Sequence, residues 1–184
     1  MRTLIINGSP RKNGDTVTLL NVLKSVLKGE IIEISTFRDK ISPCADCRKC
    51  WETGVCSIKD KMDIIYNDDF ENVIVASPIY ISGLPSHLMS LAERFQVYYG
   101  SKKILKTQRE VQSKNGGFIL IGGGDGKPDR AISQGKNILK GMNATIDAGE
   151  IILYQNTNVA PAVDDSVTVE KVKELAMRLN NFKN

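Results

Sequence analysis

The chain has 184 residues, of which 41% are hydrophobic and 25% charged, and 25 Lys and Arg against 21 Asp and Glu give a net charge of +4. This composition is ordinary for a globular protein and excludes the disordered and fibrous classes. The positive excess is mild and spread along the chain, so it indicates no nucleic-acid partner and would suit an anionic small ligand equally well.

The sequence also lacks the segments that direct a protein into or across a membrane. No stretch approaches the roughly 18 apolar residues that span a bilayer, and the apolar run at the N-terminus is too short for a signal peptide. We therefore expect a cytoplasmic protein with no membrane partner, in a compartment where thiols stay reduced.

Strand-like and helix-like patterns alternate along the chain. Apolar runs predict five strands, within residues 3–7, 30–34, 72–76, 117–121 and 144–154. Apolar residues at helical spacing predict helices over residues 16–28, 60–70, 84–99, 128–141 and 167–181. Residues 101–115 are rich in lysine and show no clear pattern. Because no repeat or linker interrupts the alternation, we expect a single domain over residues 1–184, with a cysteine-rich loop at about residues 36–59.

This alternation predicts a doubly wound α/β fold, a five-stranded parallel sheet with helices on both faces. Right-handed crossovers leave few topologies, and the strand order 2-1-3-4-5 is the leading candidate. Ligands of such sheets bind beyond the carboxyl ends of the strands. The candidate site is therefore formed by the loops at residues 7–16, 35–59, 77–85 and 122–128.

The first of these loops has the composition of a phosphate site. It joins a strand to a helix, whose N-terminal amides, with the hydroxyls of Ser9 and Thr16 and the guanidinium of Arg11, would suit a phosphate dianion. The loop lacks the Gly-Lys-Ser/Thr ending of a P-loop and the G-x-G-x-x-G spacing of a dinucleotide fingerprint. The alternative is that its glycines only turn the chain and that Asp15 is an ordinary helix N-cap.

The third loop carries a tyrosine on a turn stiffened by Pro78 and Gly83. Tyr80 could pack against a planar ligand ring, or it could simply contribute to the core. The two loops together resemble the NAD(P)H-dependent FMN reductase family of flavodoxin-like proteins. The resemblance is carried by Gly8-Ser9-Pro10-Arg11 with Gly14 and Thr16, followed by Ser77-Pro78-Ile79-Tyr80.

This resemblance implies a set of FMN-binding residues. Around the phosphate it implies Ser9, Arg11, Asn13, Asp15 and Thr16. Along the isoalloxazine ring it implies Pro78, Ile79, Tyr80, Ile81, Ser82 and Gly83, and on the other side Gly122, Gly123, Gly124 and Asp125. Many relatives carry asparagine where this chain has Asp15, and a carboxylate beside a phosphate is repulsive. We expect the Asp15 side chain to point away and to leave only its amide for the ligand.

The resemblance also implies the chemistry. FMN would take electrons from NAD(P)H and pass them to a small acceptor, such as a quinone, another flavin or an electron-poor aromatic compound, and no side-chain acid or base is required. A homodimer or higher homo-oligomer is implied as well. The alternatives are an electron carrier that does not oxidise NAD(P)H, and a flavin-free metal-binding or regulatory module.

All four cysteines lie in one short segment, as Cys44, Cys47, Cys50 and Cys56. The spacing C-x2-C-x2-C-x5-C suits the four irons of a [4Fe–4S] cluster, whereas structural zinc more often takes two separated C-x-x-C pairs. In an FMN-binding fold, this motif resembles the iron–sulfur flavoproteins, which implies one cluster and one FMN per chain and a ferredoxin-like redox partner. Free or oxidisable thiols and zinc remain as alternatives. Arg48 and Lys49 would offset part of a cluster's negative charge.

Overall fold

The computed structural model describes residues 1–67, 69–107, 111–146 and 151–181. Its centre is a parallel sheet in the order β2-β1-β3-β4-β5, with β6 also paired to β4. The strands are β1 Arg2–Asn7, β2 Glu30–Ser35, β3 Asn72–Pro78, β4 Lys114–Gly122, β5 Ala144–Thr145 and β6 Ile151–Gln155. The predicted flavodoxin-like order 2-1-3-4-5 is therefore confirmed.

The predicted fifth strand is divided into two segments that lie along the same edge of β4. β5 pairs with the beginning of β4 at Lys114 and Asn115, and β6 pairs with its second half, from Phe118 to Gly122. Residues 147–150, which also belong to the predicted strand, lie outside the described residues. The division brings the end of β6 beside the glycines that follow β4.

The longer helices form where the apolar periodicity predicts them, with two differences. All helices that the structure describes, short ones included, are α1 Asp15–Val26, α2 Lys49–Thr53, α3 Met62–Tyr66, α4 Ser86–Glu93, α5 Gln96–Tyr99, the π-helix η1 Gly100–Ile104, α6 Asp129–Gly141, the 3₁₀ helix η3 Ala162–Asp164 and α7 Ser166–Asn181. The helix predicted over residues 60–70 is limited to α3, and the helix predicted over residues 84–99 is divided at Arg94. Among the described residues, no helix is long and apolar enough to cross a membrane.

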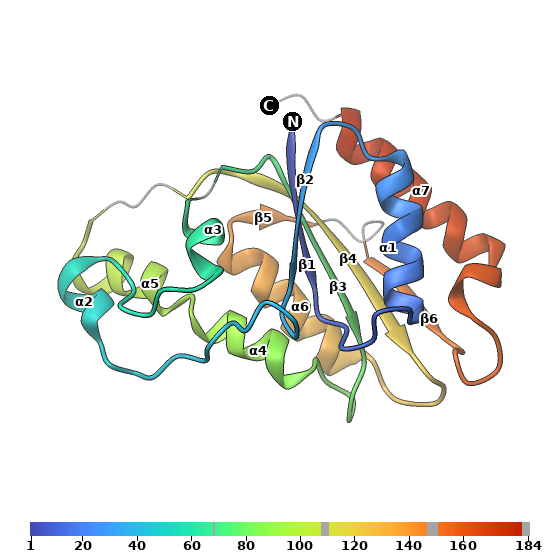
Figure 1. The fold of residues 1–184 in the computed structure, drawn as a ribbon, viewed down its shortest axis with the longest axis horizontal. Helices are drawn as coiled ribbons and strands as arrows, with labels where there is room; N and C mark the ends of the chain where they lie inside the picture. Colours follow the sequence, from blue (N-terminus) through green and yellow to red (C-terminus); the bar gives the residue numbers. More distant parts are fainter. Residues whose placement is uncertain (68, 108–110, 147–150, 182–184) are drawn as a thin grey trace.

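Helices cover both faces of the sheet, so its central strands are buried on both sides. Alternate residues of β1 point to opposite faces: Leu4 and Ile6 contact one apolar cluster, and Ile5 contacts the other. The first cluster includes apolar residues of α3, α4 and α6, and the second includes those of α1 and α7. Figure 1 shows α1 and α7 side by side, with α2 and α5 together at the opposite end of the molecule.

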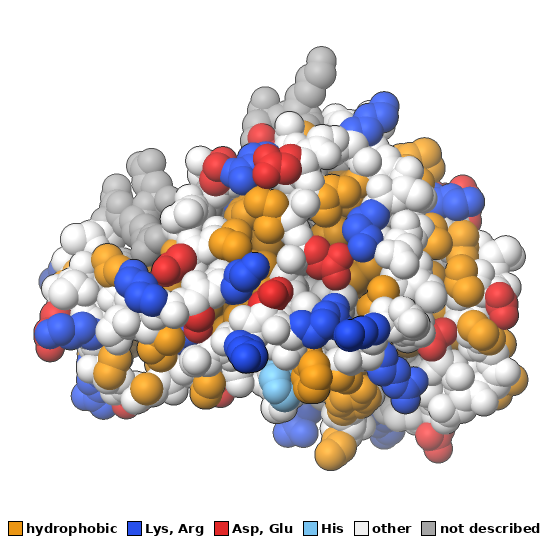
Figure 2. Space-filling model, in the orientation of Figure 1, with side chains coloured by type: hydrophobic (Ala, Val, Ile, Leu, Met, Phe, Trp, Pro, Cys, Tyr) orange, Lys and Arg blue, Asp and Glu red, His pale blue; other side chains and the backbone are white. Residues whose placement is uncertain are grey.

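The distribution of charged side chains on the surface agrees with the mild net charge. On the face seen in Figure 2, basic side chains lie among acidic and apolar ones and form no continuous stripe of one sign. Such a distribution does not suggest a nucleic-acid groove.

Gly135 tests the contact between α6 and β4. A Cβ atom at this position would lie 2.3 Å from two ring carbons of Phe118, whose side chain is fully buried. Alanine favours a helix interior by about 1 kcal/mol over glycine, but overpacking a core costs about 1–3 kcal/mol and displaces the ring. We expect Gly135→Ala to lower the free energy of unfolding by about 1–2 kcal/mol, measured by urea denaturation with circular dichroism.

Gly126→Ala is the matched control. No described atom lies within 4 Å of a Cβ atom at Gly126, so the free energy of unfolding should stay within about 0.5 kcal/mol of wild type. Equal stability of the two variants would contradict this α6–β4 contact.

Candidate functional site

The loop after β1, residues 8–14, is positioned by the buried side chain of Asn7. Its Oδ1 accepts a hydrogen bond from the amide of Ser9 at 2.9 Å, and its Nδ2 donates to Glu33 at 2.8 Å. Glu33 also pairs with Lys24 at 3.0 Å. Burial opposes ionisation of Glu33, but these bonds outweigh it and lower the pKa of the carboxyl group. Asn7 thus ties the loop to β2 and α1.

The same loop presents unpaired donors at the start of α1. The helix begins after Gly14, and the backbone amides of Gly14, Asp15 and Thr16 donate to no acceptor among the described residues. The hydroxyl-bearing side chains of Ser9 and Thr16 are buried beside them. Free amides at a helix N-terminus, together with the positive end of its dipole, favour an anion.

Asp15 does not cap its own helix, because Gly14 occupies the N-cap position. Instead, its Oδ1 accepts a hydrogen bond from the amide of Ala162, the first residue of η3, at 2.7 Å. This bond directs one carboxylate oxygen toward η3, as expected if only the amide is to serve a ligand. Asp15 therefore fastens η3 to the beginning of α1.

The loop after β3 ends in a tight turn that we name the Tyr80 turn, residues 80–83. Tyr80 and Gly83 exchange backbone hydrogen bonds of 2.9 and 3.0 Å. Between them, Ile81 and Ser82 have φ values of +51° and +58°, as in a type I′ turn. A β-branched residue rarely adopts this conformation, and such strain costs on the order of 1–3 kcal/mol. Tyr80 is 44% exposed and Ile81 is 96% exposed, so Tyr80 is not a core residue.

The glycines after β4 contact a segment that carried no recognisable motif. The amide and hydroxyl of Thr157 donate to the carbonyl of Gly122 at 3.2 and 3.3 Å, and the amide of Asn158 donates to that of Gly123 at 3.0 Å. A Cβ atom at Gly123 would lie 2.7 Å from Oδ1 of Asn158. A larger residue at position 123 would therefore displace the side chain of Asn158.

The three loops enclose two adjoining cavities of about 240 and 220 Å³. Ile79 and Gly123 line both cavities. The first is otherwise lined by Ser9, Arg11, Gly14, Asp15, Thr16, Pro78, Tyr80, Ile121, Thr157 and Asn158. The second is otherwise lined by Ile81, Ser82, Gly122, Gly124, Gly126 and Gln155. The predicted cofactor residues thus come together, except that Asn13 and Asp125 are exposed outside both cavities and Gly83 is buried behind the turn.

The four cysteines line another pocket, which shares no lining residue with these two cavities. Its volume is about 20 Å³, enough for about one water molecule. Cys50 is buried, Cys47 is exposed, and the other two are intermediate. Within the residues that the structure describes, no three His, Cys, Asp or Glu side chains form a group that could hold a single metal ion.

The thiols have different environments. Burial raises the pKa of Cys50, and the neighbouring Cys56, Cys44 and Cys47 raise it further, so all four thiols interact electrostatically. Cys47 has a lowered pKa because Ser57, 3.3 Å away, and a backbone amide hydrogen-bond its sulfur. Cys50 therefore resists ionisation in this pocket, whereas the thiolate of Cys47 is favoured.

The buried cation beside these thiols is Arg94, which sequence analysis did not identify. Its guanidinium donates to the carbonyls of Ser42 and Ile58 at 3.0 and 3.1 Å and pairs with Asp60 at 2.8 Å. Asp60 in turn accepts from the amide of Ser42 at 3.1 Å. Both ends of the cysteine segment are therefore held by this pair, which we name the Arg94–Asp60 clamp.

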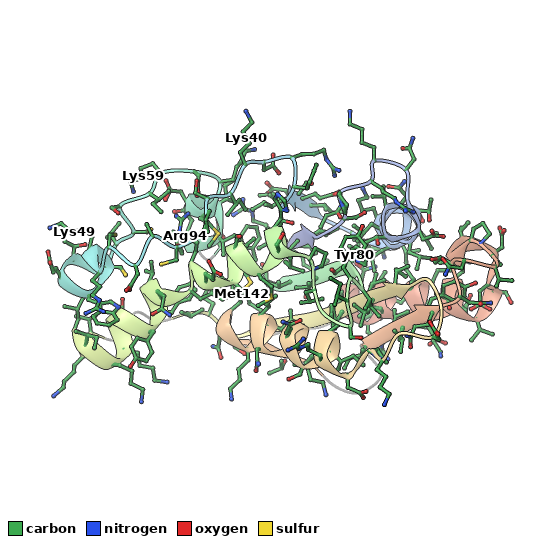
Figure 3. The ribbon with its side chains drawn as sticks, turned by 90° about the horizontal axis from the view of Figure 1, so that it is seen from below. Lys40, Lys49, Lys59, Tyr80, Arg94 and Met142 are labelled. Carbon is green, nitrogen blue, oxygen red and sulfur yellow. The ribbon has the colours of Figure 1, made fainter. Side chains whose placement is uncertain are left out.

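Arg48 and Lys49, expected to offset a cluster's charge, both have exposed side chains, and of the two only Arg48 lines the cysteine pocket. Lys49 pairs with Glu52 at 2.8 Å, and Arg48 lies over the ring of Trp51 at 4.9 Å. The buried cation of the cysteine pocket is not one of these two neighbours in sequence but Arg94, at the end of α4. Figure 3 shows Arg94 and Tyr80 well apart along the length of the molecule.

Comparison with known proteins shows which family the chain belongs to. The model of the NADPH-dependent FMN reductase family matches residues 1–157. The chain belongs to this family. It is thus an FMN-dependent oxidoreductase, as the two loop motifs suggested.

Curated relatives and solved structures resemble nearly the whole chain. An iron–sulfur flavoprotein of Methanocaldococcus jannaschii is 27% identical over 97% of this chain and 95% of its own length. One of Methanosarcina thermophila is 26% identical over 97% and 93%. The structure of an FMN-dependent NADH-azoreductase from Bacillus anthracis in complex with FMN superposes with a TM-score of 0.65 at 16% identity, covering 98% of this chain and all of that one. At that identity, the structural likeness shows a shared fold.

The Arg94–Asp60 clamp makes stability depend on pH. Burial disfavours the Asp60 carboxylate, but Arg94 and the amides of Met62 and Ser42 outweigh it and lower its pKa below 3.8. A carboxyl group with a lowered folded-state pKa stabilises the protein above its unfolded-state pKa and loses this effect as the pH falls. We expect Asp60→Asn to reduce the free energy of unfolding by about 3 kcal/mol at pH 7, and the difference from wild type to shrink below about pH 4.

Urea denaturation between pH 7 and pH 3 measures both effects. Asp63→Asn is the control, because Asp63 forms only an exposed pair with Lys59 at 3.8 Å and should change stability by less than about 1 kcal/mol. A difference between Asp60→Asn and wild type that stays constant down to pH 3 would show that the pair is not ionised as described.

Proposed function

We propose that the protein is an NAD(P)H-dependent reductase that uses FMN to deliver electrons to a small acceptor. One observation carries this proposal: Asp15 and Thr16 with their free amides, the side chain of Arg11, and Tyr80 line the same cavity. An anion site next to a half-exposed aromatic ring suits the phosphate and the planar ring of one ligand.

Each loop has a distinct part in this proposal. The amides of Asp15 and Thr16 and the guanidinium of Arg11 bind the phosphate. The Tyr80 turn and the glycines at 122–124 hold the ring from two sides, because no side chain occupies the space above Gly123 or Gly124 except that of Asn158. FMN, when bound, supplies the redox chemistry there. The exposed side of the Tyr80 turn leaves room for a nicotinamide and then an acceptor to approach the ring in turn.

We further propose that Cys44, Cys47, Cys50 and Cys56 bind a [4Fe–4S] cluster. The donor set fits: four thiols surround one pocket, and a buried cation adjoins it. A cluster binds each cysteine at a different iron, so the absence of a three-ligand group among the described residues is compatible with it and does not favour mononuclear zinc. The exposed segment between Ser42 and Ile58 would have to open, because the pocket is smaller than the cluster. The names of the archaeal relatives agree with this assignment.

Helix α4 connects the two sites. It begins after Pro85, just beyond the Tyr80 turn, and ends at Arg94 in the cysteine pocket. Eight helical residues are about 12 Å long. We propose that electrons leave the flavin either directly to a small acceptor or through the cluster to a ferredoxin-like protein. The expected homo-oligomer stays a prediction.

The flavin assignment is tested by titrating purified protein with FMN and then measuring oxidation of NADPH and NADH with a quinone as acceptor. Arg11→Gln should raise the FMN dissociation constant about tenfold, the effect of losing one charged contact. Lys12→Gln is the matched control, because Lys12 is exposed and lies outside both cavities, and its affinity should stay within about twofold.

The outcomes separate the alternatives. Folded protein that takes up no FMN contradicts the flavin assignment and favours a flavin-free module. FMN uptake without turnover of either nicotinamide, with any acceptor tried, favours an electron carrier over a reductase.

The cluster assignment is tested by anaerobic purification followed by iron, sulfide and zinc analysis. We expect about four irons and four sulfides per chain and broad absorbance in the visible region. Cys50→Ser should lose most of the iron while binding FMN like wild type, because the two sites share no lining residue. Stoichiometric zinc, or reduced thiols without metal after anaerobic reconstitution, would contradict the assignment.

A further inference from the structure

Arg94 is a fully buried arginine whose Nε atom has no hydrogen-bond partner. Its Nη atoms are committed to Ser42, Ile58 and Asp60. Its Nε has no hydrogen-bond partner, and among the described residues it is the one buried side-chain nitrogen or oxygen atom in this condition. Buried donors are nearly always satisfied in folded proteins, so an unsatisfied one calls for an acceptor.

The surroundings indicate where that acceptor belongs. Arg94 lines the pocket that all four thiols line, and Cys56 interacts electrostatically with its guanidinium. The Nη atoms donate to two backbone carbonyls and a carboxylate, and the hydroxyl of Tyr66 also interacts with the guanidinium. Nε is the nitrogen of this guanidinium that has no partner, so its N–H is available to an occupant of the cysteine pocket.

We propose that Arg94 is a positioning residue for the iron–sulfur cluster, with its Nε–H donating to a cluster or cysteine sulfur on the Cys56 side and its fixed charge raising the reduction potential. This inference rests on the proposed cluster. When one electron enters the cluster, no bond forms or breaks, but the sulfur atoms become more negative. A hydrogen-bond donor and a cation in a water-excluded site stabilise that reduced form, and both factors set the potentials of such clusters.

The exposed cations of the cysteine segment do not share this role. Arg48 is 62% exposed and already has Asp46 and Trp51 as partners, so water and salt screen its charge from the pocket. Arg48 also lines the pocket, but its charge is exposed, so Arg48→Gln removes an arginine from the pocket without removing a buried donor. It is the matched control for Arg94→Gln.

The potential is measured by spectroelectrochemical titration of the cluster in anaerobic holoprotein, with dithionite as the source of electrons. At the wild-type midpoint, Arg94→Gln should lower the ratio of reduced to oxidised cluster at least tenfold, which is about 59 mV for a one-electron couple. Arg94→Lys keeps the charge but lacks the Nε–H, and its ratio should fall by a smaller factor. Arg48→Gln should stay within about twofold of wild type.

A second measurement uses the wild-type sequence, so it does not depend on whether the variants fold. Protein labelled with ¹⁵N only in arginine is reduced, and pulsed electron paramagnetic resonance detects nitrogen nuclei close to the paramagnetic cluster. We expect an arginine nitrogen coupling in wild type and in Arg48→Gln. The coupling should be absent from the double variant Arg48→Gln/Arg94→Lys, which removes both arginines that line the pocket.

The results distinguish two failures. Wild-type protein without iron and sulfide overturns the proposed cluster itself. A wild-type cluster that shows no arginine coupling, or an Arg94→Gln cluster with an unchanged midpoint, overturns the role of Arg94 and leaves the cluster assignment standing.

Discussion

The parallel register of the central strands is the constraint on which the flavin site depends. Asn7 of β1 lies beside Ala76 of β3, and Pro78 of β3 lies beside Ile121 of β4. Because all of these strands run in the same direction, each delivers the loop that follows it to the same edge of the sheet. The loop at residues 8–14, the Tyr80 turn and the glycines at 122–124 are far apart in sequence, yet they line two adjoining cavities.

The sequence predicted those parts of the structure that depend on local signals. Buried strands are continuous apolar runs, and the loops that follow them carry glycine, proline and hydroxyl residues with definite conformational preferences. The strand order and most of the residues that line the two cavities could therefore be inferred. Asn7, Thr157 and Asn158 could not, because their role lies in contacts with distant backbone groups. A polar residue ending an apolar strand was the only signal for Asn7. The fifth strand was predicted as one segment because its apolar pattern does not reveal that two parts pair with different halves of β4.

Arg94 is a further residue whose role could not be predicted from the sequence. It lies within the helix that the apolar periodicity predicted over residues 84–99. The guanidinium instead finds Asp60, 34 residues earlier, and the carbonyls of Ser42 and Ile58. The amides of Arg94 and Phe95 donate to carbonyls three positions back, and α4 ends there before α5 begins at Gln96. A charged side chain buried by partners so far away in sequence leaves no local pattern from which it could be predicted.

The Arg94–Asp60 clamp holds the cysteine segment at Ser42 and Ile58 and uses no cysteine to do so. The residues that anchor the segment are therefore different from the cysteines that lie within it. The interval from Pro43 to Ser57 can be exchanged for loops with other ligand spacings. Such loops would be held at the same two anchors, Ser42 and Ile58, and would lie beside the buried charge of Arg94. A single flavin scaffold could then host a range of engineered metal centres at a constant separation along α4.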